Sequence, residues 1–378
     1  MTQAIQVFPV ATKSELLRFV EFPFGLYRND PNWVPPLIEE RTAFFDPAKN
    51  PFFAHARFQL FLARRGAELV GTVGAVVDDN HNAVHDERMG AFGFLETIDD
   101  QDVAGALLDA AEDWARGQGM TIMRGPLNFS INQEVGALID GFDDPPRIMM
   151  TYNPPYYPAL IEGRGYAKAM DMYAYDFDVA YALANAPAKL FHAAEKAMHN
   201  AGISVRPVDM RRFDSEVEIM KEVYNRGWEK NWGAVPMTDH EIDHLVGGLK
   251  PMLDPNLLFV AEGKNGEPAG VSLSLPDLHQ ALLWSGGGHM WPLGLPKFLW
   301  HKRRINRARV LILGTVPEYR GRGIDAYFTA ETARRALECG YKRMECSWIL
   351  ETNTMMNRML ERVGGARYKT YRVYERPL

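Results

Sequence analysis

The stretch from Arg309 to Cys339 constrains the fold more than any other part of the sequence. Its first part, Val310 to Val316, is apolar and rich in β-branched residues, which is typical of a buried strand. Pro317 ends this strand because proline cannot donate to a sheet ladder. Ala326 to Cys339 has the apolar spacing of a helix with one buried face. The stretch therefore predicts a strand, a short turn and a helix in direct succession.

The turn between the strand and the helix is basic and contains glycine. Its centre reads Arg320-Gly321-Arg322-Gly323. Glycine lets the backbone approach a ligand closely, and the first N–H groups of a helix have no partner within the helix. Arginine adds positive charge and paired donors. This arrangement predicts a site for an anion with several oxygens.

Residues 316 to 325 resemble motif A of the GNAT acyltransferases. In that family, the motif holds the pyrophosphate of acetyl-CoA or another acyl-CoA. The resemblance implies that the co-substrate is bound here, and the matching residues are Arg320, Gly321, Arg322 and Gly323. Asp325 falls within the same site, where the family has a small residue. Its carboxylate would repel a pyrophosphate unless the side chain turned outward and capped the helix.

The residues that follow resemble motif B of the same family. Asn353 stands eleven residues before Gly364, with a short helical pattern between them and a last strand over Tyr368 to Tyr374. The resemblance implies that Asn353 lies beside the pantetheine arm. The family often has a tyrosine where Leu360 stands, and that tyrosine protonates the leaving thiolate.

The resemblance also implies how the acyl group is held. The strands before and after motif A would splay apart to admit the pantetheine arm, and the backbone N–H near Val316 would polarise the thioester carbonyl. Family members often carry a glutamate base on the strand before motif A, but Val310 to Val316 contains no acid. The candidate bases are therefore Glu345 and Glu351 near the next strand, His289 in a glycine-rich loop, or a chain of waters.

The order of predicted elements occurs twice along the chain. Residues 160 to 175 align without a gap to residues 359 to 374, and both segments carry a Glu, a Gly, an Ala and a Tyr at matching positions. We interpret this as an internal duplication. The predicted fold is α/β (α+β), with two tandem GNAT-like domains, each a central mixed twisted sheet flanked by helices. The expected domains are 1–178 and 203–378, joined by residues 179–202.

The two halves differ where motif A would lie. The corresponding turn of the first half, Glu96 to Asp102, has no glycine, no arginine and four acids. Such a turn repels a pyrophosphate, so we expect the first half to be a degenerate domain that shapes the acceptor side. Two stretches are longer than the repeated order of strands and helices requires. One is the long loop 124–155, and the other is residues 279–306, which combine a glycine run with a basic run.

A rival motif, H-E-x-x-H, occurs at His240, Glu241 and His244. On a helix, the two histidines could bind zinc while Glu241 served as general base. However, Thr238 with Glu241 also forms the pattern of a capping box, and no third ligand is evident. We therefore expect no metal site and retain zinc hydrolysis only as a remote alternative.

Composition sets the remaining bounds. The chain has 378 residues, a net charge of −6 and two cysteines, which disfavours nucleic-acid binding and a disulfide framework. No signal peptide and no apolar run of about 20 residues is visible, so we expect a cytoplasmic protein without a membrane span. The predicted function is transfer of an acyl group, most simply acetyl, from acyl-CoA to the amine of a small molecule or peptide. The alternative is a non-catalytic module that binds CoA or acts as a scaffold. The sequence does not indicate the oligomeric state.

Overall fold

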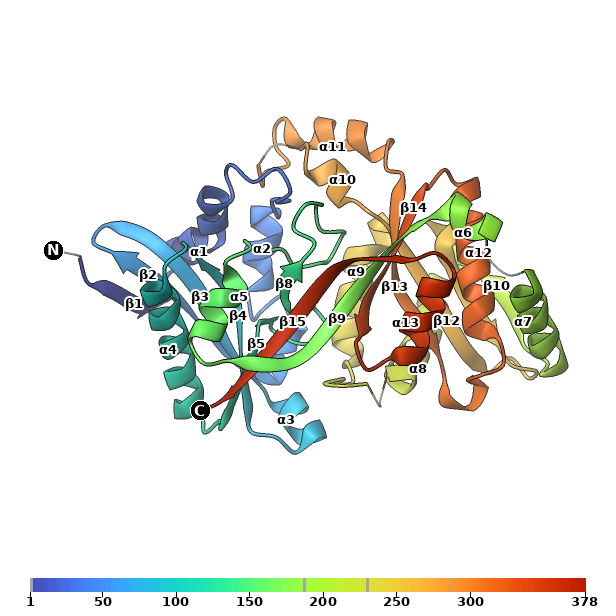
Figure 1. Cartoon of the computed structure of the whole chain (residues 1–378), viewed down its shortest axis with the longest axis horizontal. Coiled ribbons are helices and arrows are strands. Elements are labelled where there is room, and N and C mark those ends of the chain that lie inside the picture. The colour runs from blue at the N-terminus through green and yellow to red at the C-terminus, as the bar shows by residue number, and fades with distance from the viewer. Residues whose placement is uncertain (1–2, 186–187, 229–230, 286) are drawn as a thin grey trace. The chain divides into compact units, whose positions relative to one another are not determined.

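The computed structural model describes residues 3–185, 188–228, 231–285 and 287–378 (Figure 1). The chain divides into two compact units. Unit 1 comprises residues 1–172, 281–300 and 369–378, and unit 2 comprises residues 173–280 and 301–368. Residues 186 and 187 of the expected connecting segment, and Gly286 of the glycine run, lie outside the described residues. None of the helices in the described ranges is long and apolar enough to cross a membrane.

Unit 1 is a twisted sheet with helices against it. Its strands follow the order β1-β2-β3-β4-β5, and the end of β15 pairs with β5. The elements are β1 (Ile5–Pro9), α1 (Lys13–Leu26), α2 (Ile38–Phe44), β2 (Ala56–Arg65), β3 (Glu68–Asp78), α3 (Asp79–His85), β4 (Met89–Thr97), α4 (Gln101–Gly117), β5 (Ile122–Gly125), β6 (Leu127–Asn128), β7 (Glu134–Val135), β8 (Ala137–Asp140) and α5 (Tyr157–Gly163).

Unit 2 repeats this plan. Its strands follow the order β9-β14-β13-β12-β11-β10. The elements are α6 (Val179–Asn185), α7 (Ala188–Asn200), β10 (Ser204–Pro207), α8 (Phe213–Trp228), α9 (Asp239–Leu249), β11 (Leu258–Glu262), β12 (Pro268–Pro276), β13 (Arg307–Thr315), α12 (Ile324–Glu338), β14 (Arg343–Leu350) and α13 (Thr354–Arg362). The two strands β9 (Ala167–Asp178) and β15 (Ala366–Pro377) each contribute residues to both units.

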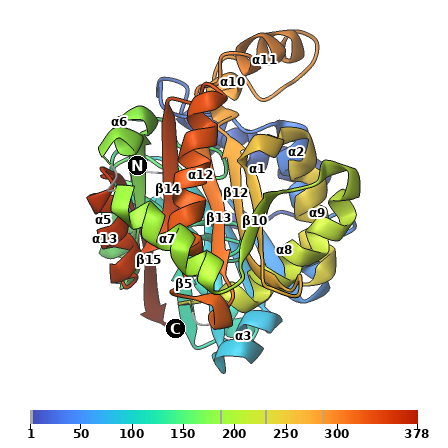
Figure 2. The same ribbon diagram turned by 90° about the vertical axis from the view of Figure 1, so that its right-hand side faces the viewer.

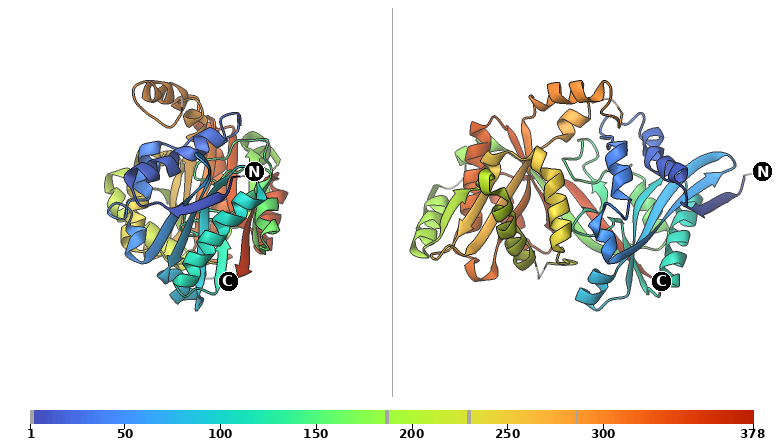
Figure 3. Two further views of the ribbon diagram at one scale, coloured as in Figure 1. Left: turned by 90° about the vertical axis from the view of Figure 1, so that its left-hand side faces the viewer. Right: turned by 180° about the vertical axis from the view of Figure 1, so that it is seen from behind.

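The core of each unit lies between the sheet and the helix that follows the central strand. In unit 1, Val73, Phe92 and Leu107 are fully buried where α4 packs on the strands. In unit 2, Phe328 of α12 is buried against Phe259 of β11. Figures 1 and 3 show α12 on one face of the unit 2 sheet and α8 with α9 on the other. Each unit thus has a central mixed sheet flanked by helices, and the expected fold class is confirmed.

The structure also contains elements that the sequence did not indicate. Helix α3 is one example, and β6, β7 and β8 occupy the expected loop 124–155. These elements have only two to seven residues, which is too short for a periodic apolar pattern to show. The short helices α10 (His279–Leu282) and α11 (Gly294–Lys302) lie in the inserted segment 279–306. The expected domain boundaries at 178 and 203 follow the duplication rather than the two units, so that division stays a prediction.

Candidate acyl-transfer site

The basic glycine turn leads directly from β13 into α12, as the motif requires. Gly321 and Gly323 have φ values of +73° and +93°, which favour glycine over other residues. Gly323 is the N-cap of α12 and provides no side-chain cap. The first N–H groups of α12 therefore have no side-chain acceptor at the cap, and this is the end of a helix that attracts an anion.

The surroundings of the two glycines differ. A Cβ atom at Gly323 would lie 2.8 Å from backbone atoms of Ala194, because α7 packs against the turn at this point. A Cβ atom at Gly321 would meet nothing within 4 Å. Gly323 is thus required for packing as well as for its φ angle, whereas the space beside Gly321 is open to a ligand.

The two arginines of the turn are exposed. Arg320 donates from Nη2 to the carbonyl oxygen of Gly227 at 2.7 Å and from Nε to that of Thr315 at 3.3 Å. The guanidinium of Arg322 lies over the ring of Tyr319, 5.3 Å from its centroid. The turn therefore gathers two cationic groups beside the start of α12, although Arg320 also fastens the turn to α8.

Asp325 does not turn outward to cap the helix. Thr315 Oγ1 donates to Asp325 Oδ1 at 2.5 Å, and Gly323 occupies the N-cap position. The expectation that Asp325 caps α12 is therefore wrong. Its carboxylate instead accepts a hydrogen bond from the hydroxyl of Thr315 at the end of β13. A carboxylate in the first turn of a helix is also favoured by the helix dipole.

The strands on either side of motif A separate, as the resemblance implies. β13 and β14 are paired in parallel only from Arg307 and Arg343 to Val310 and Cys346, although both strands continue further. The register of β13 against β12 shifts at the same place, which marks a bulge in β13. A gap therefore opens between β13 and β14 beyond Val310.

The sheet register shows which N–H groups of β13 face this gap. The N–H of Val316 donates to the carbonyl oxygen of Ala269 at 3.1 Å, so it is already engaged towards β12. Successive N–H groups of a strand point to opposite sides. The N–H groups of Leu313 and Thr315 therefore point away from β12, on the side where β14 has separated. The sequence did not indicate these two N–H groups. Which N–H groups of β13 face β12 depends on the bulge, and the bulge is not visible in the sequence.

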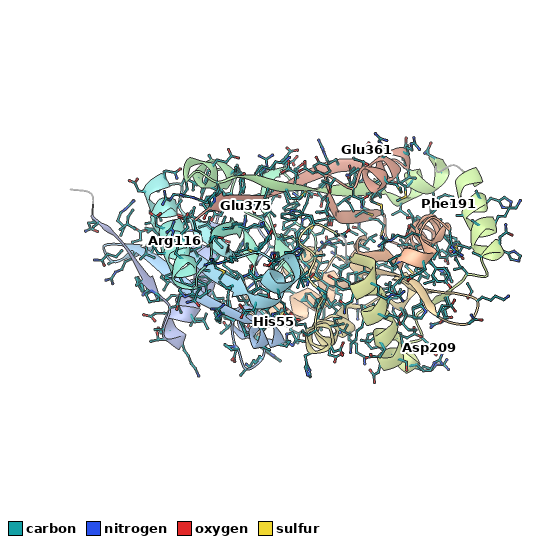
Figure 4. All side chains as sticks on the ribbon, turned by 90° about the horizontal axis from the view of Figure 1, so that it is seen from below. His55, Arg116, Phe191, Asp209, Glu361 and Glu375 are labelled. Atoms are coloured by element: carbon teal, nitrogen blue, oxygen red, sulfur yellow. The ribbon has the colours of Figure 1, made fainter. Side chains whose placement is uncertain are left out.

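An apolar cavity begins at this gap. The empty space between its lining atoms is about 630 Å³ when the solvent at its open side is included. It is lined by residues of β9, β13, β14, α6, α12 and α13, and Figure 4 labels Phe191, its contribution from α7. The lining residues are Phe177, Val179, Ala182, Leu183, Phe191, Val310, Leu313, Thr329, Ala330, Thr332, Ala333, Met344, Cys346, Leu360 and Val363. None is charged, and burial raises the pKa of the Cys346 thiol to about 12, so this thiol stays neutral at physiological pH.

The three candidate bases lie in different places. Glu345 is fully buried on β14, where its register partner is Arg309 of β13, which is also buried. Because side chains alternate along a strand, Glu345 lies on the face of the sheet opposite Cys346 and the cavity. Glu351 is half-buried just beyond the end of β14. His289 belongs to unit 1, where its Nδ1 lies 3.1 Å from a carboxylate oxygen of Glu39.

Asn353 caps a helix. Its side-chain oxygen accepts from the N–H of Met356 at 3.2 Å and so caps α13. This position at the start of the motif B helix places Asn353 in unit 2 with the glycine turn, Glu345 and Glu351. Its role beside a pantetheine arm stays a prediction.

Comparison with known proteins identifies the family. The sequence is 39% identical to the bacterial ceramide synthase of Caulobacter vibrioides, and the match covers 99% of this chain and 98% of the relative. It is 37% identical to Protein YghO of Escherichia coli, over 97% and 94% of the two chains. The chain belongs to the family of these two proteins. No family model matches the sequence.

Solved structures extend this result to the fold. One is a tandem GNAT protein from the clavulanic acid biosynthesis pathway, with a TM-score of 0.58, 12% identity and coverage of 99% and 98% of the two chains. Another is a GCN5-related N-acetyltransferase from Sphaerobacter thermophilus, with a TM-score of 0.51, 13% identity and coverage of 99% and 95%. Our chain has the tandem GNAT fold.

The two units of this tandem GNAT protein differ at the start of the helix after the central strand and at the gap beside that strand. In unit 1, the side chain of Asp100 caps α4 by accepting from the N–H groups of Asp102 and Val103. The gap beside β4 is filled as well, because a Cβ atom at Gly93 would lie 2.0 Å from the carbonyl oxygen of Leu127 in β6. In unit 2, the corresponding helix cap is a bare glycine, and the gap opens into a cavity.

Unit 1 carries a half-buried acid, Glu96, at the end of β4. Tyr27 and Tyr157 donate to Glu96 Oε2 at 2.7 and 2.8 Å. Burial nevertheless raises the pKa of Glu96 from its ordinary value of 4.5 to about 7, although both hydrogen bonds oppose this shift. The neutral acid is therefore favoured in the folded unit well above the pH at which an exposed glutamate ionises.

This shift predicts how the stability of the protein depends on pH. Because the pKa of Glu96 is raised on folding, the neutral acid contributes its full stabilisation below about pH 4.5. This stabilisation is lost as the pH rises through about 7. We expect the free energy of unfolding to fall by about 2 to 3 kcal/mol across this range. In Glu96→Gln the fall should be largely absent, and in the control Glu68→Gln, at an exposed site, it should persist. Urea unfolding at pH 4.5 and at pH 7.5 gives the change in the free energy of unfolding for each protein. An equal change in the wild type and both variants would contradict the raised pKa of Glu96.

The H-E-x-x-H segment lies on α9 and is engaged in helix capping. Thr238 and Glu241 form a full capping box, and Glu241 is largely buried. Asp243 of the same helix pairs with Lys221 at 2.8 Å. Within the described ranges, no group of three His, Cys, Asp or Glu residues is placed to hold a metal ion. The carboxylate of Glu241 thus caps the start of α9 and is not positioned as a general base.

Proposed function

We propose that this protein is an N-acyltransferase that moves a long-chain acyl group from an acyl-CoA thioester to an amine. The apolar cavity at the gap between β13 and β14 is the observation that carries the proposal. An acetyl group needs no such space, whereas a fatty acyl chain gains about 0.8 kcal/mol for each methylene that leaves water. The sequence favoured acetyl-CoA because it gave no sign of the cavity.

The name of the relative from Caulobacter vibrioides also supports transfer of a long-chain acyl group to an amine. That relative is a bacterial ceramide synthase, and a ceramide is the N-acyl derivative of a sphingoid base. We propose that the acceptor of this protein is likewise the primary amine of a long-chain amino alcohol.

The residues of unit 2 take the following roles in the proposal. The start of α12 with Arg320 and Arg322 would hold the pyrophosphate. The N–H groups of Leu313 and Thr315 would donate to the thioester carbonyl oxygen as it gains negative charge. Val316 would support this region through its bond to Ala269 rather than by donating to the carbonyl.

The reaction needs one proton acceptor. The amine nitrogen attacks the carbonyl carbon, the C–N bond forms, the C–S bond breaks, and CoA leaves as a thiolate. The proton lost by the amine requires a base. Glu345 stands one residue before the point where β13 and β14 part, so we propose it ahead of Glu351 and His289.

Removing both arginines of the turn tests the donor site. In the double variant Arg320→Ala/Arg322→Ala we expect affinity for CoA to fall by at least about tenfold to a hundredfold, because a single hydrogen bond to a charged group already contributes about 1.5 to 3 kcal/mol. The control is Arg334→Ala, which removes an exposed arginine of the same helix that pairs with Glu331. Calorimetric titration with CoA gives the comparison. Equal affinity in the double variant and the wild type would place the CoA site elsewhere.

A further inference from the structure

One segment of unit 1 exposes large apolar side chains. Of the ten such residues in the described ranges, five fall between positions 284 and 300. They are Trp284, Trp291, Leu293, Leu299 and Trp300, each more than half exposed. A protein surface rarely gathers so many large apolar groups unless something binds them. Figure 2 shows α11 of this segment and α10, which comes directly before the segment along the chain.

The backbone of this segment is fastened to unit 1. The carbonyl oxygen of Gly288 accepts from the N–H of Ile38 at 2.9 Å, and His289 contacts Glu39. Gly288 packs so closely on Phe24 that a Cβ atom there would lie 2.6 Å from the ring. The apolar side chains are therefore presented to solvent by a segment with a defined attachment.

The charge of the same region is wholly positive. No Asp or Glu occurs between Asp277 and Glu318, although the whole chain has a net charge of −6. Lys297 lies on α11, Lys302 ends this helix and Arg303 follows it, and all three are exposed. The exposed tryptophans and leucines are thus followed closely along the chain by basic residues.

We propose that Trp284 and the described residues 288–302, which include the whole of α11, dock on the surface of a lipid bilayer that contains anionic phospholipids. Tryptophan and leucine side chains enter the boundary between headgroups and acyl chains, while lysine and arginine extend to the anionic headgroups. A helix of nine residues is too short to span a bilayer but can lie in its interface. This inference does not rest on the proposed function, because it concerns a different part of the chain.

Vesicle sedimentation tests the inference. The wild type is mixed with vesicles of phosphatidylcholine alone or of phosphatidylcholine with phosphatidylglycerol. We expect binding to the anionic vesicles that weakens as salt is raised. Leu293→Gln/Leu299→Gln should lower the partition coefficient roughly tenfold or more, because both leucines would leave the interface. Lys297→Glu/Lys302→Glu should have a similar effect, because each basic residue adds to the attraction.

Matched controls carry the same changes elsewhere on unit 1. Leu17→Gln/Val84→Gln alters two other exposed apolar residues, and Lys13→Glu/Arg18→Glu reverses two other exposed charges. Both should bind vesicles as the wild type does. A failure of the wild type to bind anionic vesicles, or an equal loss in the controls, would overturn the inference. So would a concentration-dependent dimer that only the segment variants abolish, since a second copy would then cover this surface.

Calorimetric titration of the same preparations with CoA separates this inference from the proposed function. CoA binding without vesicle binding would overturn the proposal that this segment docks on a bilayer and would leave the proposed function standing. Vesicle binding without CoA binding supports the surface and counts against the proposed function.

Discussion

Filling the cavity with one phenylalanine should reduce the transfer of long acyl chains and leave the transfer of short ones. Ala333 lies on α12 and lines the cavity. A phenylalanine there would displace on the order of three methylenes of a bound chain, so we expect kcat/KM with palmitoyl-CoA to fall by roughly 50-fold to 100-fold. Activity with short acyl-CoA thioesters should change little, because a short chain does not reach this part of the cavity.

The control for this experiment is Leu337→Phe, which adds a ring on the exposed side of the same helix. It should leave the chain-length profile of the wild type unchanged. Packing a larger side chain into a filled core costs about 1 to 3 kcal/mol, so thermal unfolding and CoA titration of Ala333→Phe must show that the protein is folded. An unchanged chain-length profile in folded Ala333→Phe would mean that the cavity does not hold the acyl chain.

Replacing the buried glutamate of β14 should reduce turnover more than any other single change in unit 2. In Glu345→Gln we expect kcat to fall by about a hundredfold to ten-thousandfold, the range that general-base catalysis contributes. Affinity for CoA should remain, because Glu345 lies on the face of the sheet opposite the cavity. The dependence of kcat on pH should also lose the limb that reports ionisation of the base.

Glu351→Gln is the matched control, since it makes the same change beyond the end of the same strand. We expect its turnover to stay within a few fold of the wild type. Loss of turnover in Glu351→Gln with little change in Glu345→Gln would transfer the role to Glu351. Because Glu345 is fully buried, we also expect its replacement to lower the free energy of unfolding by about 0.5 to 3 kcal/mol, as core substitutions generally do. Both variants are therefore compared at a temperature where calorimetry shows them folded.

Local chemistry allowed the fold to be predicted from the sequence. Proline at position 317 and the two glycines of the turn mark the ends of a strand and a helix, and these boundaries depend on nearby residues alone. The duplication was also visible, because a repeated order of elements needs no knowledge of packing. For the same reason, the tandem GNAT resemblance extended to the whole chain.

The contents of the site could not be predicted in the same way. The cavity is lined by residues from positions 177 to 363, and a gap of this kind depends on where β13 and β14 stop pairing. The engagement of Val316 with Ala269 depends on the register of β13 against β12, which a bulge has shifted. The inward turn of Asp325 depends on the hydroxyl of Thr315, ten residues away. Each of these results from tertiary packing, which local patterns do not record.

The most direct test of the central claim is a search for the N-acylated product by mass spectrometry. The purified protein is incubated with sphinganine and, in separate reactions, with acetyl-CoA or palmitoyl-CoA. Our account predicts an N-palmitoyl product that requires the protein, forms faster than any N-acetyl product, and forms at least about tenfold more slowly with Arg320→Ala/Arg322→Ala when palmitoyl-CoA is limiting. Faster formation of the N-acetyl product, or no acylated amine with either donor, would contradict it.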